Sequence, residues 1–259
     1  MGEDVKLSID GHVATVLIHR PAQRNALSIR ANQELFGCWE AVDADERIRA
    51  VVLTSSDCGT FCAGMDLKEA ARVKAEQGRD ILELLKDPML QRLRSVRKPV
   101  IAAMTGHFTA GGMVLALNAD LRVGLAGSMG GITEARLGRG SPWAVPLLWM
   151  LPQPVLMEMV LTGSLMPIER LADFGFVNYV ESTPDAVRTR AHALATVIAA
   201  NAPLSVAAGK ASLLAGMALG SRAGYDEARR LHAAVYASED AQEGPRAFAE
   251  KRTPVWRGR

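Results

Sequence analysis

The sequence lacks a strong charge of either sign. Its 259 residues include 30 Lys and Arg and 28 Asp and Glu, which leaves a formal net charge of +2. This balance gives no basis for electrostatic attraction to nucleic acid or to a membrane surface, so neither is expected as a partner. No run of about 18 apolar residues occurs, and no basic N-terminal segment precedes an apolar stretch, which together predict a cytoplasmic protein.

Cysteine is also scarce. Cys38, Cys58 and Cys62 are the three in the chain, and an odd number in a sequence of this length does not suggest a disulfide framework. No second Cys or His pair completes a zinc pattern, so no metal site is expected. The 49% hydrophobic and 22% charged residues are typical of a globular protein with a sizeable core.

Several well-known catalytic and phosphate-binding motifs are missing. The sequence has neither the Gly-Lys-Ser/Thr of a P-loop nor a Gly-x-Gly-x-x-Gly that opens a helix. The segment 126–130, AGSMG, is the nearest approach to a serine-hydrolase elbow, but it lacks the first glycine. The sequence therefore contains neither of these two phosphate-binding fingerprints, and it does not favour a serine hydrolase.

The hydrophobic pattern indicates α/β organisation. Short β-rich runs alternate with glycine turns and helical stretches in the first half, whereas helical periodicity dominates beyond about residue 145. We predict an α/β core over residues 1–195 and a helical C-terminal region over 196–259, packed on the core or on a neighbouring subunit. The predicted strands are 13–18, 50–54, 100–104, 120–124 and 176–180; the predicted helices cover 35–42, 187–198, 204–219 and a short last segment that Gly244-Pro245 introduces and that ends near Lys251.

Two glycine-rich segments, 59–68 and 106–115, place glycine where a backbone must come close to another group. The second one joins the end of a strand to the start of a helix, whose free amide N–H groups suit a developing oxyanion. Spacing alone also fits an ordinary tight turn in each case. Glu134 lies between glycines, and its position in the sequence fits either a surface charge or a catalytic acid/base.

The ordered set of segments resembles the crotonase, or enoyl-CoA hydratase/isomerase, family. The segments are HRPAQRNALS (19–28), GTFCAGMDLKE (59–69), GHFTAGGMVLALNADLRV (106–123), GGITEARLG (130–138), LTGSLMPIERLADFGFVNYV (161–180) and SEDAQEGPRAFAEKRTPVW (238–256). The resemblance implies a spiral of ββα units followed by a helical trimerisation region. It also implies assembly as a homotrimer or a dimer of trimers.

The resemblance further implies the chemistry of the site. The backbone N–H groups of Met65 and Gly111 correspond to the pair that polarises an acyl-CoA thioester carbonyl, and Glu134 to the acid/base. Coenzyme A enters as part of the substrate, and no permanently bound cofactor is expected. The positions that correspond to substrate and coenzyme contacts are Arg24, Ala26, Ala63, Asp66, Leu67, Lys68, Phe248 and Lys251.

One departure from the family pattern limits the functional prediction. Family hydratases with two glutamates carry the other one at the position of Val114, and valine cannot activate water. An enoyl-CoA hydratase is the nominal prediction. A 3-enoyl-CoA to 2-enoyl-CoA isomerase, a hydroxycinnamoyl-CoA hydratase-lyase and a non-catalytic acyl-CoA-binding module are the alternatives.

The acyl pocket is less clearly indicated by the sequence. Met65, Met113 and Trp143 are candidates for an apolar lining, whereas Trp149 is expected in the core. Arg139 and Ser141 lie where the family often has small residues, which suggests a polar or hydroxylated acyl group.

Overall fold

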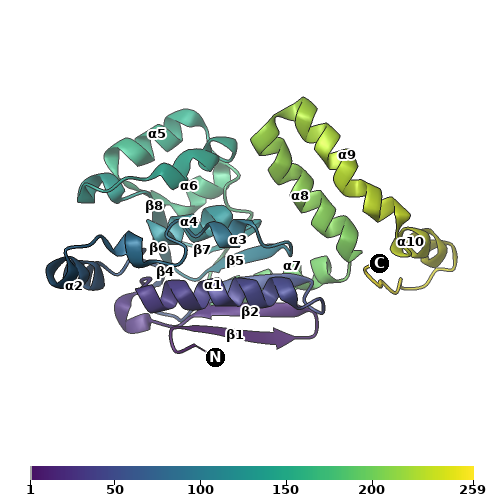
Figure 1. Ribbon diagram of the computed structural model, residues 1–259, viewed down its shortest axis with the longest axis horizontal. Coiled ribbons are helices and arrows are strands. Elements are labelled where there is room, and N and C mark those ends of the chain that lie inside the picture. Colours follow the sequence, from purple (N-terminus) through teal and green to yellow (C-terminus); the bar gives the residue numbers. More distant parts are fainter. Residues whose placement is uncertain (1) are drawn as a thin grey trace.

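The computed structural model describes residues 2–259 and confirms a mixed α/β core with a helical C-terminal region (Figure 1). Two β-sheets form the core. Their strands are β1 (Val5–Asp10), β2 (Val13–Ile18), β3 (Ala50–Ser55), β4 (Thr60–Cys62), β5 (Val100–Met104), β6 (His107–Thr109), β7 (Leu121–Leu125), β8 (Met129–Gly131), β9 (Leu165–Pro167) and β10 (Tyr179–Glu181).

The larger sheet has the strand order β1-β2-β3-β5-β7-β10. The β1–β2 hairpin is antiparallel and the remaining pairs are parallel. Every residue of β3 and β5 is buried, as expected for continuous apolar runs covered on both faces. Alternate residues face opposite layers: Ala50 and Val52 pack with the helix α7 (Pro184–Ala199), and Val51 and Leu53 belong to the main core.

The smaller sheet has the order β4-β6-β8-β9, and its first three strands run parallel. Each of these short strands follows a strand of the larger sheet directly in the chain, as β3 leads to β4, β5 to β6 and β7 to β8. The chain thus repeats a ββα-like unit. This repetition aligns the carboxyl ends of β4, β6 and β8.

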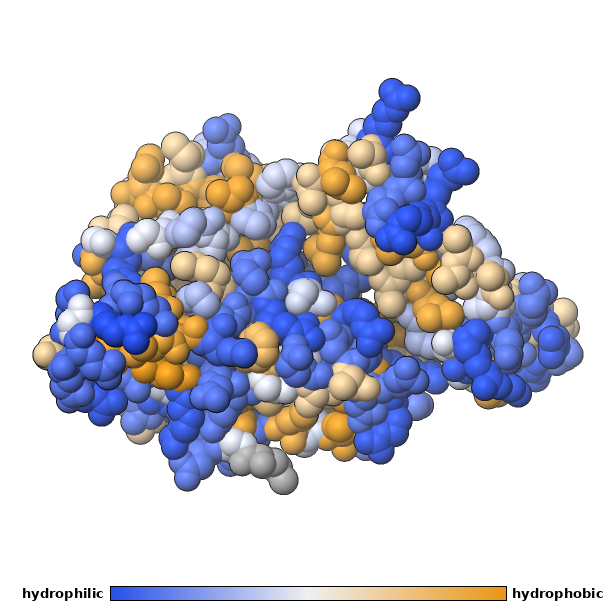
Figure 2. Space-filling view, viewed as in Figure 1, coloured by the Kyte–Doolittle hydropathy of each residue, from blue (hydrophilic) through white to orange (hydrophobic). Residues whose placement is uncertain are grey.

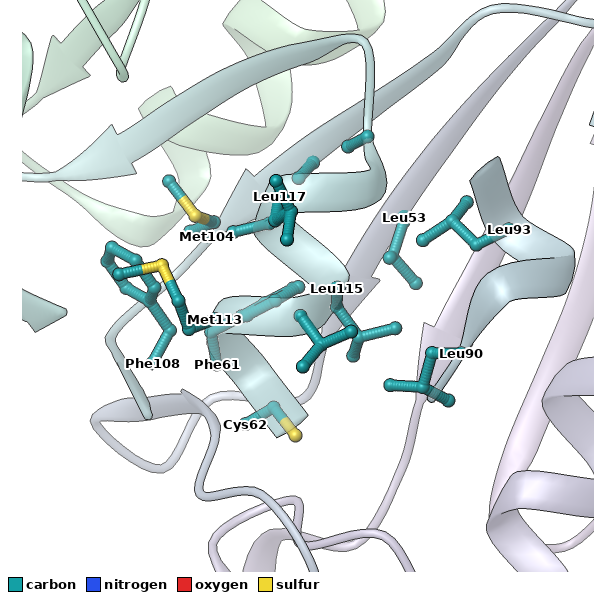
Figure 3. Packing of buried hydrophobic residues seen from close by; sticks show 14 of the residues in the cluster. Leu53, Phe61, Cys62, Leu90, Leu93, Met104, Phe108, Met113, Leu115 and Leu117 are labelled. Atoms are coloured by element: carbon teal, nitrogen blue, oxygen red, sulfur yellow. The ribbon is translucent and has the colours of Figure 1, made fainter. Parts of the chain in front are cut away.

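The helices cover the sheets and extend beyond them. Figure 3 shows Met113, Leu115 and Leu117 of the central helix α4 among buried side chains from other segments. The α-helices are α1 (Ile29–Ala44), α2 (Leu67–Gln77), α3 (Gln91–Arg94), α4 (Gly111–Asn118), α5 (Gln153–Thr162), α6 (Ile168–Asp173), α7 (Pro184–Ala199), α8 (Pro203–Leu219), α9 (Ser221–Ala237) and α10 (Asp240–Ala249); the 3-10 helices are η1 (Pro21–Gln23), η2 (Ile81–Leu84), η3 (Glu134–Leu137) and η4 (Pro142–Trp149).

The helices α8 and α9 form a hairpin that stands away from the sheets, with α10 beyond it (Figure 1). Large apolar side chains on this hairpin are solvent-exposed, including Leu213 at 76% and Tyr236 at 77%. Within residues 2–259, no single helix is long and apolar enough to cross a membrane. The successive helices α7 and α8 meet that criterion only as a pair bent by 111°.

Several predicted elements differ from the structure in their bounds. The helix predicted over 35–42 is α1, which spans Ile29–Ala44, and the strand predicted over 120–124 is β7, which spans Leu121–Leu125. The strand predicted over 176–180 begins only at Tyr179. The Phe176 amide donates to the Leu171 carbonyl at 3.0 Å, and the Arg122 amide donates to the side-chain oxygen of Asn178 at 2.8 Å instead of to a main-chain carbonyl. The last helix begins at Asp240, and Pro245 lies inside it. This start is earlier than predicted, and the Ser238 hydroxyl, ahead of the N-cap Glu239, accepts a hydrogen bond from the Ala241 amide at 3.1 Å.

Candidate functional site

The three segments predicted to carry chemistry follow three adjacent parallel strands. Met65 comes shortly after β4, Gly111 directly follows the end of β6, and Glu134 comes shortly after β8. The carboxyl ends of parallel strands lie at one edge of a sheet. All three residues accordingly line one cleft.

The amide N–H groups of Met65 and Gly111 have no acceptor among the described residues, for two different reasons. At the parallel bridge between Leu27 and Met65, the hydrogen bonds use the neighbours: Leu27 donates to the Gly64 carbonyl at 2.7 Å, and Asp66 donates to the Leu27 carbonyl at 3.0 Å. Gly111 is the first residue of α4, where the helix itself supplies no acceptor. Two main-chain donors therefore remain available beside the cleft.

A close backbone approach brings these two donors together. A Cβ atom built on Gly64 would lie 3.1 Å from the Gly111 amide nitrogen and 2.8 Å from Cβ of Ala110. Gly64 also has a φ of +89°, which disfavours any other residue. Ala110 has the unusual φ of 50° at the N-cap of α4, and such strain persists only where the surrounding structure enforces it.

Glu134 is buried at the first turn of η3, with 8% of its surface exposed. Its Oε1 accepts a hydrogen bond from the indole N–H of Trp143 at 3.1 Å. Its Oε2 is buried and has no partner among the described residues. Burial raises the pKa of this carboxyl group. The backbone amide of Glu134, the indole N–H of Trp143 and the backbone of Thr133 oppose the rise, in that order, without cancelling it. The arrangement suits a group that alternates between acid and base.

The remaining wall of the cleft is mainly apolar. It is formed in part by Leu82, Leu85, Pro88, Met89, Leu90, Val114 and Leu137. Arg139 is a charged side chain in this lining, and it forms a two-pronged ion pair with Asp80 at 2.5 and 2.9 Å. That ion pair holds the pKa of Asp80 down to about 2. It joins the segment after α2 to the segment after η3, which form two sides of the cleft.

The structure also gathers most of the predicted coenzyme-contact segment. Ala63, Met65 and Leu67 line the cleft, and the Ala63 amide donates to the carbonyl of Arg24 at 3.2 Å. Lys68 is exposed in the first turn of α2. No carboxylate among the described residues lies within salt-bridge distance of Arg24 or Lys68, so both cations are free to meet another anion.

Arg20, which was not predicted as a site residue, connects the parts of this segment. Its guanidinium bonds to the Asp66 carboxylate at 3.0 Å and to the backbone carbonyl of Ala26. Next to it, the Asn25 side-chain amide donates to the carbonyls of Ser56 and Thr60 at 2.9 and 2.8 Å. Arg20 lies in the segment HRPAQRNALS that carries the family resemblance, but a basic residue before proline has no distinctive pattern of its own that would indicate this role.

Phe248 and Lys251 are not part of the cleft within one chain. Phe248 is 87% exposed on α10, and Lys251 follows the end of that helix. In Figure 1, α10 lies at the opposite end of the molecule from α2. A single chain therefore does not bring these two residues together with the other predicted contacts.

Only some of the predicted acyl-pocket residues line the cleft. Met65 and Trp143 line the cleft, whereas Met113 is fully buried in the core. Trp149 is 59% exposed, so its expected place in the core is wrong. Arg139 lines the cleft, and Ser141 is not among the lining residues.

Comparison with known proteins identifies the class. The family model described as enoyl-CoA hydratase/isomerase matches residues 8–259. The chain belongs to the enoyl-CoA hydratase/isomerase family, and its ββα core and helical C-terminal region are those of the crotonase fold. Membership supports an enzyme that acts on acyl-CoA thioesters.

Individual relatives cover nearly the whole chain. An (E)-benzylidenesuccinyl-CoA hydratase from Thauera aromatica is 33% identical, over 98% of this chain and 99% of its own length. An enoyl-CoA hydratase of Mycobacterium tuberculosis is 34% identical, over 100% of this chain and 98% of its length. The crystal structure of an enoyl-CoA hydratase from Bacillus anthracis superposes with a TM-score of 0.92 at 28% identity, covering 99% of this chain and 100% of that one.

Proposed function

We propose that the protein is an enoyl-CoA hydratase in which the amides of Met65 and Gly111 bind the thioester oxygen and Glu134 transfers the proton. The observation that carries the proposal is the meeting of two free main-chain donors and one buried carboxyl group in a single cleft. Relatives named as hydratases, at 33% and 34% identity, support hydration as the reaction.

In the proposed hydration, negative charge develops on the thioester oxygen while Glu134 moves a proton from water to the substrate. As the water oxygen bonds to C3 of a 2-enoyl thioester, Glu134 takes a water proton and negative charge moves to the thioester oxygen. The two amides stabilise that charge; removal of one such donor in other enzymes slows turnover by about 10²- to 10³-fold. Glu134 then returns the proton to C2, which restores the carbonyl and completes the addition of H and OH.

A double-bond isomerase is the second candidate, and Val114 favours it. Val114 lines the cleft on the first turn of α4 and is 3% exposed, so it offers no second base there. Isomerisation needs one carboxylate: Glu134 would take a proton from C2 of a 3-enoyl thioester and deliver it to C4. The same two amides would hold the dienolate oxygen during this transfer.

The coenzyme is proposed to lie along the segment before and into α2. Leu67 and Ala63 line the cleft. Arg24, whose carbonyl accepts a hydrogen bond from the Ala63 amide, and Lys68, which follows Leu67, are the unpaired cations that would bind the phosphate groups. The scaffold that Arg20 forms with Ala26 and Asp66 keeps the backbone of this segment in place.

A neighbouring subunit is proposed to supply Phe248 and Lys251. The region 196–259 would then act as a trimerisation region, in a homotrimer or a dimer of trimers. Apolar side chains gather over α5 and along α8 and α9 in Figure 2, and Leu161 on α5 is 69% exposed. Burial of such surfaces drives association. Light scattering coupled to size exclusion tests this directly, and a monomer that is fully active would overturn it.

The reaction is tested with three substrates offered in parallel to wild type and to Glu134→Gln. Crotonyl-CoA reports hydration, a 3-enoyl-CoA reports double-bond migration, and feruloyl-CoA reports chain cleavage. Turnover of crotonyl-CoA to the 3-hydroxy product is expected, and it should be lost in Glu134→Gln while CoA-ester binding persists. Glu158→Gln, an exposed carboxylate on α5, is the matched control. Full activity of Glu134→Gln would refute the assignment of the base, and tight binding of all three esters without turnover would refute catalysis.

A further inference from the structure

Trp143 contacts the carboxyl group of Glu134 inside the cleft. Its side chain is 7% exposed and lines the cleft. Its indole N–H, a donor with no acceptor capacity, is directed at Oε1 of Glu134 at 3.1 Å. A buried indole N–H normally finds an acceptor, and here that acceptor is the carboxyl group of the proposed base.

The two oxygens of Glu134 therefore have different surroundings. Oε1 is held by Trp143, whereas Oε2 is buried without a partner among residues 2–259. An unpaired buried polar atom costs free energy, and Oε2 is the oxygen left free to meet a substrate proton. The pairing of one oxygen fixes the rotation of the carboxyl group about its last torsion, which is otherwise broad.

The backbone around Trp143 explains how it can hold a fixed position. Pro142 occupies the first turn of η4, where the fixed φ of proline suits a helix start. The helix η4 packs against α4, whose first residue is Gly111. A contact from η4 to Glu134 thus relates the carboxyl group to the same helix that presents one of the two amides.

We propose that Trp143 is a positioning residue that holds Oε1 of Glu134 and leaves Oε2 as the oxygen that exchanges the proton with the acyl group. The inference rests on the proposed role of Glu134. It assigns different roles to the two carboxyl oxygens, and it adds a functional residue that lies outside the glycine-rich segments.

The electrostatic surroundings allow the effect to be measured. The other charged side chain that lines the cleft is Arg139, and its charge is paired with Asp80. Asn32 and Thr133, which also line the cleft, are neutral. A hydrogen bond donated to the ionised carboxylate lowers its pKa, so loss of the indole N–H should raise the pKa of Glu134 further.

Trp143→Phe tests the proposal because it keeps an aromatic ring and removes the N–H. We expect kcat to fall about tenfold or more, the size of effect of a hydrogen bond to a charged group. The acidic limb of the kcat/KM profile should move to higher pH, and CoA-ester affinity should stay within about twofold. The matched control is Trp149→Phe on the same helix, where the ring is 59% exposed; it should leave all three quantities unchanged.

An infrared titration provides a readout that does not depend on turnover. The difference spectrum between wild type and Glu134→Gln identifies the carboxyl stretch of Glu134, and its midpoint should move to higher pH in Trp143→Phe. Unchanged kcat, pH profile and infrared midpoint in a folded Trp143→Phe variant would overturn the inference. If Glu134→Gln is inactive in the same series, the proposed base would still stand, whereas an active Glu134→Gln would refute the base itself.

Discussion

A methyl group at position 64 should separate the two amides and abolish most of the activity. In Gly64→Ala, the added Cβ would lie 2.8 Å from Cβ of Ala110 and 3.1 Å from the Gly111 nitrogen. Both neighbours are backbone-fixed atoms that cannot rotate away, so the segments 63–65 and 110–111 must move apart. Displacement of one donor corresponds to about 3 kcal/mol of lost transition-state stabilisation, or a kcat lower by about 10²- to 10³-fold.

The matched control isolates the contact from the backbone strain. Gly11 has a φ of +55°, and a Cβ built on it meets nothing within 4 Å. Gly11→Ala and Gly64→Ala share the strain of a left-handed conformation, which costs about 1–2 kcal/mol, but only Gly64→Ala adds overpacking of about 1–3 kcal/mol. The two variants are compared by kcat on the substrate found active in the panel and by thermal melts. If Gly64→Ala keeps a kcat within about threefold of Gly11→Ala, the two amides do not act as a pair.

Three further outcomes are expected. Asp80→Asn removes the ion pair with Arg139 that joins two sides of the cleft. Because both side chains are about a third exposed, the variant should lose less than about 1 kcal/mol of stability. Steady-state kinetics should show a higher KM with kcat nearly unchanged. Glu134→Gln should be more stable than wild type at neutral pH, because the folded state raises the pKa of Glu134 above the reference value of 4.5. The wild type therefore loses stability as pH rises above 4.5. The difference in melting temperature between the two proteins should vanish below pH 4.5. Ellman's reagent should titrate one thiol in the native protein, Cys58, because the other two cysteines are buried, and all three after denaturation; more than one fast-reacting native thiol would contradict the packing.

The strands of the larger sheet were predictable where burial on both faces leaves a continuous apolar run. Val100–Met104, which is buried at every residue, was predicted with its observed bounds. Val13–Ile18 was also predicted with its observed bounds, although only alternate residues of that strand are buried. The short strands of the smaller sheet were not predicted, because three residues cannot show a period. The segment 129–131 contains two glycines, and its strand character comes from pairing with β6 and β9 rather than from its own propensity.

The contacts of the site were likewise predictable only in part. Glu134 could be singled out only through the resemblance to a family, because a lone glutamate between glycines is usually a surface residue. Its burial and its bond to Trp143 depend on how η3 and η4 pack, which no local pattern encodes. Likewise, the ion pair of Arg139 with Asp80 joins residues far apart in the chain, and nothing in either neighbourhood indicates the partner.

The two amide donors are a special case, because every residue other than proline has one. The sequence can therefore record such a site only through the residues that permit the approach, and these are glycines. A Cβ on Gly112 would lie 2.2 Å from the carbonyl oxygen of Cys62, and one on Gly64 would meet Ala110. These contacts hold the start of α4 against the end of β4, where β4 and β6 pair in parallel. Gly64, Gly106, Gly111 and Gly112 are thus explained by the close packing of two neighbouring ββα units, whereas Gly59 has open space around it and a φ of +74°. The same packing brings the free amides of Met65 and Gly111 to one side of the cleft.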